Sequence, residues 1–192
     1  MNKKRFIAIG TAVVVIWLIF CYLTAPTIRH LPLTEREHFI LNPGFGDSVN
    51  MFEVGRGTYE LQLYYYHFGD LMETNGLFSP LYISGRREMV TFYSNLTTEG
   101  HINFAIRTLW LTVPSYLEIE VGTPAFSWAS EPVERIGNLS GGHEYLLMTY
   151  HIGDGPIFTK EGIEMQDLGS QRIEDFSDVE HLVIITIQRI NE

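Results

Sequence analysis

The chain has 192 residues, of which 45% are hydrophobic and 19% are charged, and its formal net charge is −10. This composition excludes a disordered chain, and the 17 glycines and 8 prolines follow no collagen-like period. The length suffices for one domain of ordinary size, with a core that needs neither a metal nor a disulfide to fold.

The N-terminus carries the clearest pattern in the sequence. Residues 6–25 contain no charged side chain, and about 20 apolar residues suffice for a helix to cross the hydrocarbon layer of a membrane. Lys3, Lys4 and Arg5 precede this run, so the positive-inside rule places the N-terminus in the cytoplasm and the remainder outside. We therefore expect a cytoplasmic tail (1–5), a transmembrane anchor (6–25), a stalk (26–57) and an extracytoplasmic β domain (58–192).

A cleaved signal peptide is the alternative interpretation of the same segment. The apolar region of a signal peptide usually spans about 7–15 residues and ends in a small-x-small cleavage site. The run here is longer, and the best candidate site ends at Ala25 and is followed by Pro26, which disfavours cleavage. The favoured prediction is an uncleaved, single-pass protein of the cell membrane.

The predicted external part is strongly acidic. Residues 26–192 hold ten Lys and Arg and all 23 acids, a net charge of −13. Such a field disfavours nucleic acid and anionic lipid head groups and attracts cations or a basic partner, although solubility alone also explains it. The one cysteine, Cys21, lies in the apolar run, so the domain has no disulfide, which fits a bacterial surface protein.

From Thr58 onward the hydrophobic pattern changes to a period of two, which is typical of half-buried strands. The apolar positions of the first strand are Tyr59, Leu61, Leu63 and Tyr65. Asn75-Gly76 follows between apolar runs and predicts a hairpin turn, because both central residues of such a turn need positive φ. A β-meander over 58–84 is the expectation.

Further strands are predicted at 87–94, 101–113, 116–121, 144–152 and 181–190, with Pro114 ending the second of these runs. The last run is almost continuously apolar, as is typical of a central strand that is covered on both faces. Turn signals separate about eight strands. The predicted fold class is all-β, an antiparallel β-sandwich or a jelly-roll-like barrel.

Catalytic motifs are absent from the sequence, and one carboxylate pair is the weak exception. Glu118 and Glu120 are two positions apart on a predicted strand, so their side chains point the same way, about 7 Å apart. Two carboxylates at such a spacing serve glycoside hydrolysis. Because both alternate with apolar residues, a solvated outer face explains them better, and we expect no catalytic site.

Seven histidines offer possible metal ligands, but no two stand three to five residues apart. His67 with Asp70 is the best local pair, across a predicted tight turn. Two ligands do not make a metal site. The sequence therefore predicts neither a metal ion nor another cofactor.

The aromatic residues suggest a binding surface. Alternation puts Tyr64 and Tyr66 on the more polar face of the first strand, where paired rings suit sugars or a protein partner. Trp128 in a loop is a third candidate. Coverage of this face by a second sheet or by the stalk is the alternative.

These patterns predict a membrane-anchored extracytoplasmic binding module whose partner is an unknown protein or glycan of the cell envelope, and not nucleic acid. Two alternatives remain open. One is a glycan-active envelope enzyme that uses Glu118 and Glu120. The other is an accessory subunit whose anchor packs against a larger membrane complex.

Overall fold

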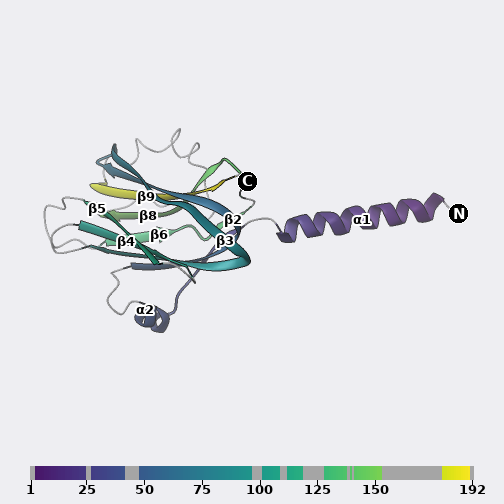
Figure 1. The fold of residues 1–192 in the computed structure, drawn as a ribbon, viewed down its shortest axis with the longest axis horizontal. Helices are drawn as coiled ribbons and strands as arrows, with labels where there is room; N and C mark the ends of the chain where they lie inside the picture. The colour runs from purple at the N-terminus through teal and green to yellow at the C-terminus, as the bar shows by residue number, and fades with distance from the viewer. Residues whose placement is uncertain are drawn as a thin grey trace.

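The computed structural model describes residues 3–24, 27–41, 48–96, 101–108, 112–118, 128–137, 139, 141–152 and 179–190. Two helices and nine strands occur in these ranges (Figure 1): α1 (Lys3–Thr24), β1 (Ile28–Leu31), α2 (Glu35–Leu41), β2 (Ser48–His67), β3 (Asp70–Leu96), β4 (His101–Arg107), β5 (Thr112–Glu118), β6 (Trp128–Pro132), β7 (Arg135–Ile136), β8 (Glu144–Ile152) and β9 (His181–Ile190). Every strand pair in the described part of the chain is antiparallel. The all-β prediction is confirmed.

The long hairpin of β2 and β3 connects two layers of sheet. Along the path β5-β4-β3-β2-β9-β8-β6, β2 changes its neighbour in mid-strand. Residues 51–54 pair with β1, whereas residues 58–67 pair with β9 on the same edge. The register shifts where this change occurs, between Gly55 and Gly57. Strands that bend at such irregularities can pass from one sheet of a sandwich to the other.

Two polar contacts hold this bend in place. Tyr59 is fully buried, and its hydroxyl donates a hydrogen bond of 2.8 Å to the carbonyl oxygen of Gly55. On β3, the Oε1 atom of Glu88 accepts a hydrogen bond of 2.8 Å from the backbone N–H of Gly85. A Cβ at Gly57 would lie only 3.1 Å from the Tyr59 ring, so a glycine lets the backbone pass close to it.

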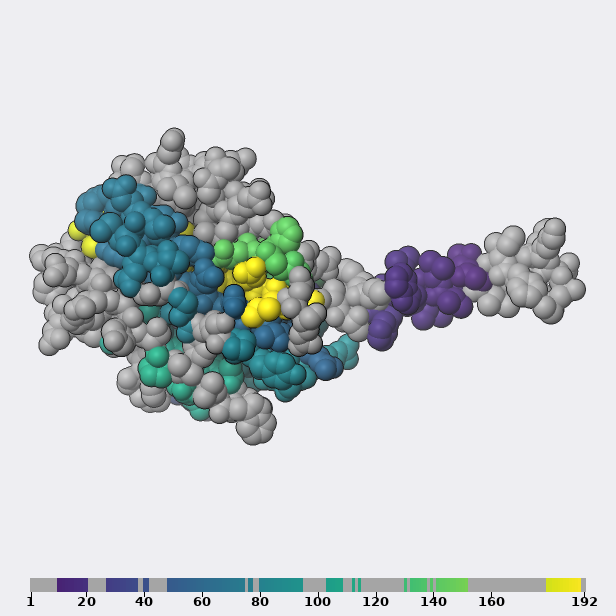
Figure 2. Space-filling view, turned by 45° about the horizontal axis from the view of Figure 1, so that its top comes forward, coloured from purple at the N-terminus to yellow at the C-terminus, as the bar shows by residue number. Residues whose placement is uncertain are grey.

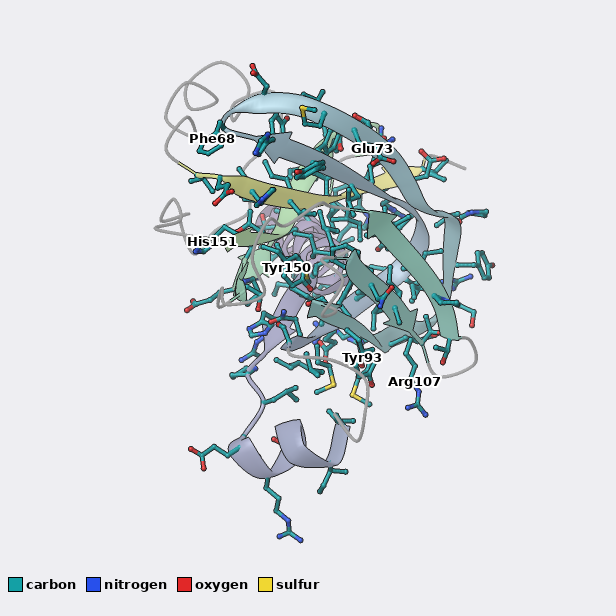
Figure 3. All side chains as sticks on the ribbon, turned by 90° about the vertical axis from the view of Figure 1, so that its left-hand side faces the viewer. Phe68, Glu73, Tyr93, Arg107, Tyr150 and His151 are labelled. Carbon is teal, nitrogen blue, oxygen red and sulfur yellow. The ribbon has the colours of Figure 1, made fainter. Side chains whose placement is uncertain are left out.

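The core lies between the layers. Phe104 of β4 and Tyr150 of β8 meet at a ring-centroid distance of 5.4 Å, and Figure 3 shows Tyr150 in the interior. The hydroxyls of Ser48 on β2 and Ser130 on β6 are 2.6 Å apart, which joins strands that are not neighbours in the sheet. Residues 181–187 of β9 are all buried, as predicted for a central strand.

Only one of the two turns predicted in this region is present. The tight turn between His67 and Asp70 forms at Phe68-Gly69, whereas Asn75 and Gly76 lie within β3, opposite Leu63 and Gln62. The local preference of Asn-Gly for a turn is overridden because continuous pairing of β3 with β2 satisfies the backbone of both strands.

The predicted strand 101–113 is also divided. β4 ends at Arg107, and β5 pairs back on it from Thr112, with Pro114 inside β5 opposite Ala105. β5 is at the end of the sheet path and pairs with β4 alone among the described strands. An edge strand tolerates proline because one row of its backbone groups needs no partner.

Part of the predicted stalk belongs to the β domain. β1 and the first ten residues of β2 lie within 26–57, and β1 pairs with both β2 and β7. Between them, α2 begins with a capping box formed by Thr34 and Glu37. The backbone N–H of Thr34 donates to Glu37 (2.8 Å), and the N–H of Glu37 donates to the Thr34 hydroxyl (3.3 Å).

The helix α1 projects away from the β domain (Figures 1 and 2), and its side chains from Gly10 to Phe20 are exposed. These eleven residues are the part of α1 whose side chains the structure describes. Across the described residues, no helix has both the length and the apolar character that a membrane crossing requires. The predicted transmembrane helix at 6–25 is therefore not supported by the structure.

Candidate functional site

The strongest candidate for a functional site lies at one end of the sheet, where β2 ends and β9 begins. His67 and His181 are directly opposite each other in the β2–β9 register. The backbone N–H of Phe68 donates a hydrogen bond of 3.2 Å to the carbonyl oxygen of Glu180. This bond joins the β2–β3 turn to the start of β9, so His67, Glu180 and His181 are brought together by backbone pairing.

A tight turn fixes the position of His67. Phe68 and Gly69 form a two-residue connection with φ of 48° and 85°, and positive φ at both positions is typical of a type I′ hairpin turn. The Phe68 ring is 53% exposed at the tip of this hairpin (Figure 3) and lies 4.7 Å from the His67 ring. The aromatic contact limits how far the imidazole can turn away from the cluster.

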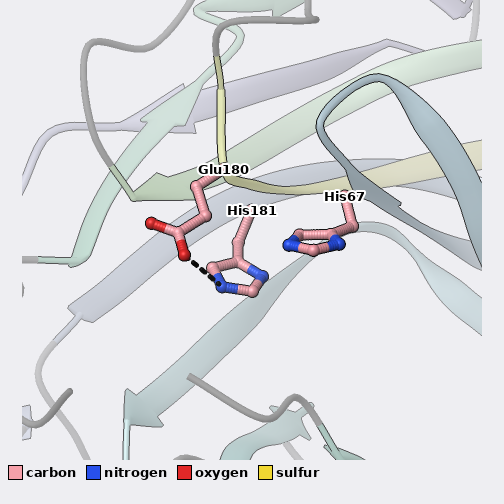
Figure 4. Close-up of side chains that lie close together, drawn as sticks. All are labelled: His67, Glu180 and His181. Carbon is pink, nitrogen blue, oxygen red and sulfur yellow. Dashed lines mark ion pairs between the residues drawn. The ribbon is translucent and has the colours of Figure 1, made fainter. Parts of the chain in front are cut away.

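Three side chains form the cluster drawn in Figure 4. One possible ligand atom each from His67, Glu180 and His181 lies within 4.8 Å of the other two. His181 Nε2 is 3.6 Å from Glu180 Oε1. The His181 side chain is 3% exposed, whereas that of Glu180 is 41% exposed. The cluster thus has one buried member and an open side toward solvent.

Tyr65 orients His181. The Tyr65 hydroxyl oxygen is 2.8 Å from His181 Nδ1, and the two rings stack at a centroid distance of 6.0 Å. Burial raises the pKa of the Tyr65 phenol to about 12, so the hydroxyl stays protonated. Because Nδ1 is engaged by this hydroxyl, Nε2 is the ring nitrogen that remains available as a ligand atom. Nε2 is buried and has no hydrogen-bond partner among the described residues.

The environment of His181 favours the neutral imidazole. Burial is the main cause that lowers its pKa, and the nearby His67 lowers it further, against an opposing effect of Glu180. If Nδ1–H donates to Tyr65, Nε2 carries a lone pair that faces the Glu180 carboxylate. Nε2 and the carboxylate oxygen are then two acceptors with no proton between them. A cation placed between them would satisfy both atoms.

Two imidazoles and one carboxylate suit a transition-metal ion such as Zn²⁺, Cu²⁺, Ni²⁺ or Fe²⁺ rather than Mg²⁺ or Ca²⁺. Tetrahedral Zn²⁺, with bonds of about 2.0–2.2 Å, holds its ligand atoms about 3.3–3.5 Å apart. The cluster must therefore contract slightly. The His67 and His181 rings are stacked 5.0 Å apart at 20°, and a bound metal lies in the plane of each ring, so His67 has to tilt.

The predicted tyrosine surface is largely covered. Tyr66 is 5% exposed, and Tyr64 is half-buried, with its hydroxyl 2.8 Å from Glu144 Oε1 and 2.9 Å from Gln62 Oε1. Glu144 also accepts a hydrogen bond from Thr186. Burial and the Glu144 carboxylate raise the pKa of Tyr64. The two rings do not form an exposed pair, because β8 and β9 pack beside them.

The other predicted candidates are placed only in part. Trp128 begins β6 and Glu118 ends β5, but their side chains are outside the described part of the structure. Glu120 lies outside the described residues altogether. The structure thus brings none of these three residues into a described site.

The His67–Glu180–His181 cluster was not predicted from the sequence because its two segments are more than a hundred residues apart. Local spacing cannot detect such a site. One signal was present, since each histidine stands at the end of a predicted strand, and Glu180 directly precedes the second one. Only the pairing of β2 with β9 makes those two ends neighbours.

Comparison with protein-family models, with curated proteins and with solved structures finds no match for this chain.

Proposed function

We propose that this protein is an extracytoplasmic, membrane-attached binding module that takes up a transition-metal ion through His67, Glu180 and His181. The observation that carries the proposal is His181. Its Nδ1 is held by Tyr65 at 2.8 Å, while its buried Nε2 faces a carboxylate oxygen at 3.6 Å without a hydrogen-bond partner among the described residues. Buried polar atoms are rarely left in this state without a reason.

The arrangement resembles the usual environment of a metal-binding histidine. Such a histidine binds the metal through one ring nitrogen and engages an oxygen through the other, which fixes its tautomer and orientation. Tyr65 supplies that oxygen here. The partly exposed Glu180 and His67 provide a route for the ion, and the acidic charge of the chain favours the approach of cations.

Membrane attachment is supported by the N-terminal sequence together with the exposure of α1. Valines and other large apolar side chains of α1 are 47–66% exposed, so the β domain does not cover them. The apolar run continues from Phe6 to Ala25, past the side chains that are described, and three cations precede it. Such an apolar segment fits a lipid environment best. The cations before it favour an orientation with the β domain outside the cell.

Metal titration of the purified full chain tests the proposal. We expect one Zn²⁺ ion to bind per chain, and Co²⁺ in its place to give the visible absorption bands of a low-coordinate site. His67→Ala and Glu180→Gln alter half-buried positions at the end of the sheet, so both variants should fold. Each should weaken Zn²⁺ binding at least tenfold, and Ca²⁺ should not compete.

His143→Ala is the matched control, because His143 is exposed and lies outside the cluster. This variant removes a histidine but should bind Zn²⁺ like the original chain. Equal losses in His143→Ala and His67→Ala would mean that surface histidines bind the ion without a defined site, and the proposal would fail.

The location is tested separately. Protease added to intact cells should digest the β domain, and the purified protein should retain residues 1–25 and partition with membranes. A chain recovered in the soluble fraction, or digested only after lysis, would contradict the proposed location but not the metal site.

A further inference from the structure

A pocket of about 610 Å³ lies at β1 and its neighbouring strands, and it is lined by three arginines from three strands. Arg29 comes from β1, Arg87 from β3 and Arg135 from β7. Residues 26–192 contain only ten Lys and Arg. Three of these ten cations therefore gather at one pocket of a domain whose overall charge is strongly negative.

Two of the arginines lie on paired strands. Arg29 and Arg135 are directly opposite in the β1–β7 register. Like charges at directly opposite positions destabilise a sheet. Neither guanidinium forms an ion pair with another residue in the described part of the chain. A fold gains nothing from this pairing by itself, whereas an anion between the two side chains would relieve it.

The acidic residues of the pocket leave these two charges available. Glu53 is opposite Arg29 in the β1–β2 register, but its Oε1 is 2.6 Å from Arg87 Nη1. Glu53 is therefore already engaged, and Arg87 is held at the rim by this bond. Glu134 adds a second carboxylate to the lining. A ligand that combines an oxyanion with hydroxyl or ammonium donors would match both kinds of side chain.

We infer that this pocket binds a phosphate group, held by the guanidinium groups of Arg29 and Arg135, with Arg87 able to join them. Guanidinium forks match phosphate oxygens in a bidentate manner, and arginine is the residue that proteins favour for such recognition. The volume is in the usual range of small-ligand sites, about 300–1,000 Å³. This inference does not use the metal cluster or depend on it.

The phosphate has two possible sources, a lipid head group or a soluble phosphate ester. Thr27 lines the pocket and is three residues after the end of α1 at Thr24. Because consecutive Cα atoms are about 3.8 Å apart, these residues are separated by at most about 11 Å. If α1 attaches the protein to a membrane, the pocket is close enough for a head-group phosphate to enter it.

Binding to two probes tests the inference, with the full chain in a phosphate-free detergent. Calorimetry measures binding of inorganic phosphate, and mixed micelles with phosphatidylglycerol provide the lipid phosphate. We expect saturable binding of at least one probe. Arg29→Gln and Arg135→Gln should each weaken it about tenfold or more, because each removes charge-assisted hydrogen bonds. Binding of the lipid alone would identify a head-group site, and binding of inorganic phosphate would identify a site for soluble esters.

Two further variants sharpen the test. Glu53→Gln releases Arg87 from its ion pair, so it should strengthen phosphate binding. Arg107→Gln removes an exposed arginine of β4 (Figure 3) that does not line this pocket, and it should leave binding unchanged. Melting temperatures check that each variant is folded. Absence of saturable binding to both probes, or equal binding by Arg29→Gln, Arg135→Gln and the original chain, would overturn the inference.

Discussion

The Tyr65→Phe substitution tests whether the Tyr65 hydroxyl supports His181 in the proposed metal site. It removes the hydroxyl that lies 2.8 Å from His181 Nδ1 but keeps a ring that is 9% exposed and stacked on the imidazole. The packing should therefore persist, while the orientation and tautomer of His181 lose their support. Loss of such a partner lowers metal affinity about 10–100-fold, which corresponds to about 1.4–2.7 kcal/mol.

Thermal melts measure this effect without a reporter group. Zn²⁺ at one hundred times its dissociation constant should stabilise the original chain by about 2.7 kcal/mol. For a domain of this size, 1 kcal/mol corresponds to about 2–4 °C, so the melting temperature should rise by about 5–11 °C. At the same Zn²⁺ concentration, a 10–100-fold weaker site gives only about 0.4–1.4 kcal/mol, or about 1–6 °C.

Tyr82→Phe provides the control, because the Tyr82 ring is 62% exposed and on β3 away from the cluster. It should show the full rise in melting temperature with Zn²⁺. If Tyr65→Phe bound Zn²⁺ as tightly as the original chain, His181 Nε2 would need no support from Tyr65, and the proposed role of Tyr65 would be refuted.

Three further predictions concern the fold and the acidic pair. Tyr66→Ala should lower the free energy of unfolding by about 3–5 kcal/mol because this ring is 5% exposed, and a loss below about 0.5 kcal/mol in denaturant titration would show that the ring is not in the core. Tyr59→Phe should cost about 1–3 kcal/mol by the same measurement, since the buried carbonyl of Gly55 loses its 2.8 Å donor, and no change would mean that the bend does not depend on this bond. Glu118→Gln combined with Glu120→Gln should change stability by about 0.5 kcal/mol or less and leave Zn²⁺ affinity unaltered, whereas a folded double variant without biological activity would point to catalysis.

The fold class and the strands with the strongest patterns could be predicted from the sequence alone. The ranges 144–152 and 181–190 were predicted from their apolar content, and β8 and β9 occupy the same residues. The capping box of Thr34 and Glu37 is a local feature of the same kind, because its two hydrogen bonds join residues three positions apart. In each case the deciding interaction was local or depended only on the period of the side chains.

Tertiary structure decided the path of the β2–β3 hairpin and the composition of the site. Asn75-Gly76 stays extended because β2 offers partners along almost the whole of β3, a contact that no local propensity reveals. Tyr66 is buried although it belongs to the more polar face of its strand, because packing around that face supplies the cover. His67 and His181 each look isolated in the sequence, and Arg29 and Arg135 are likewise more than a hundred residues apart along the chain. Strand pairing alone makes them neighbours, and the physical reason is that register joins residues by their position across the sheet, not by their separation in the sequence.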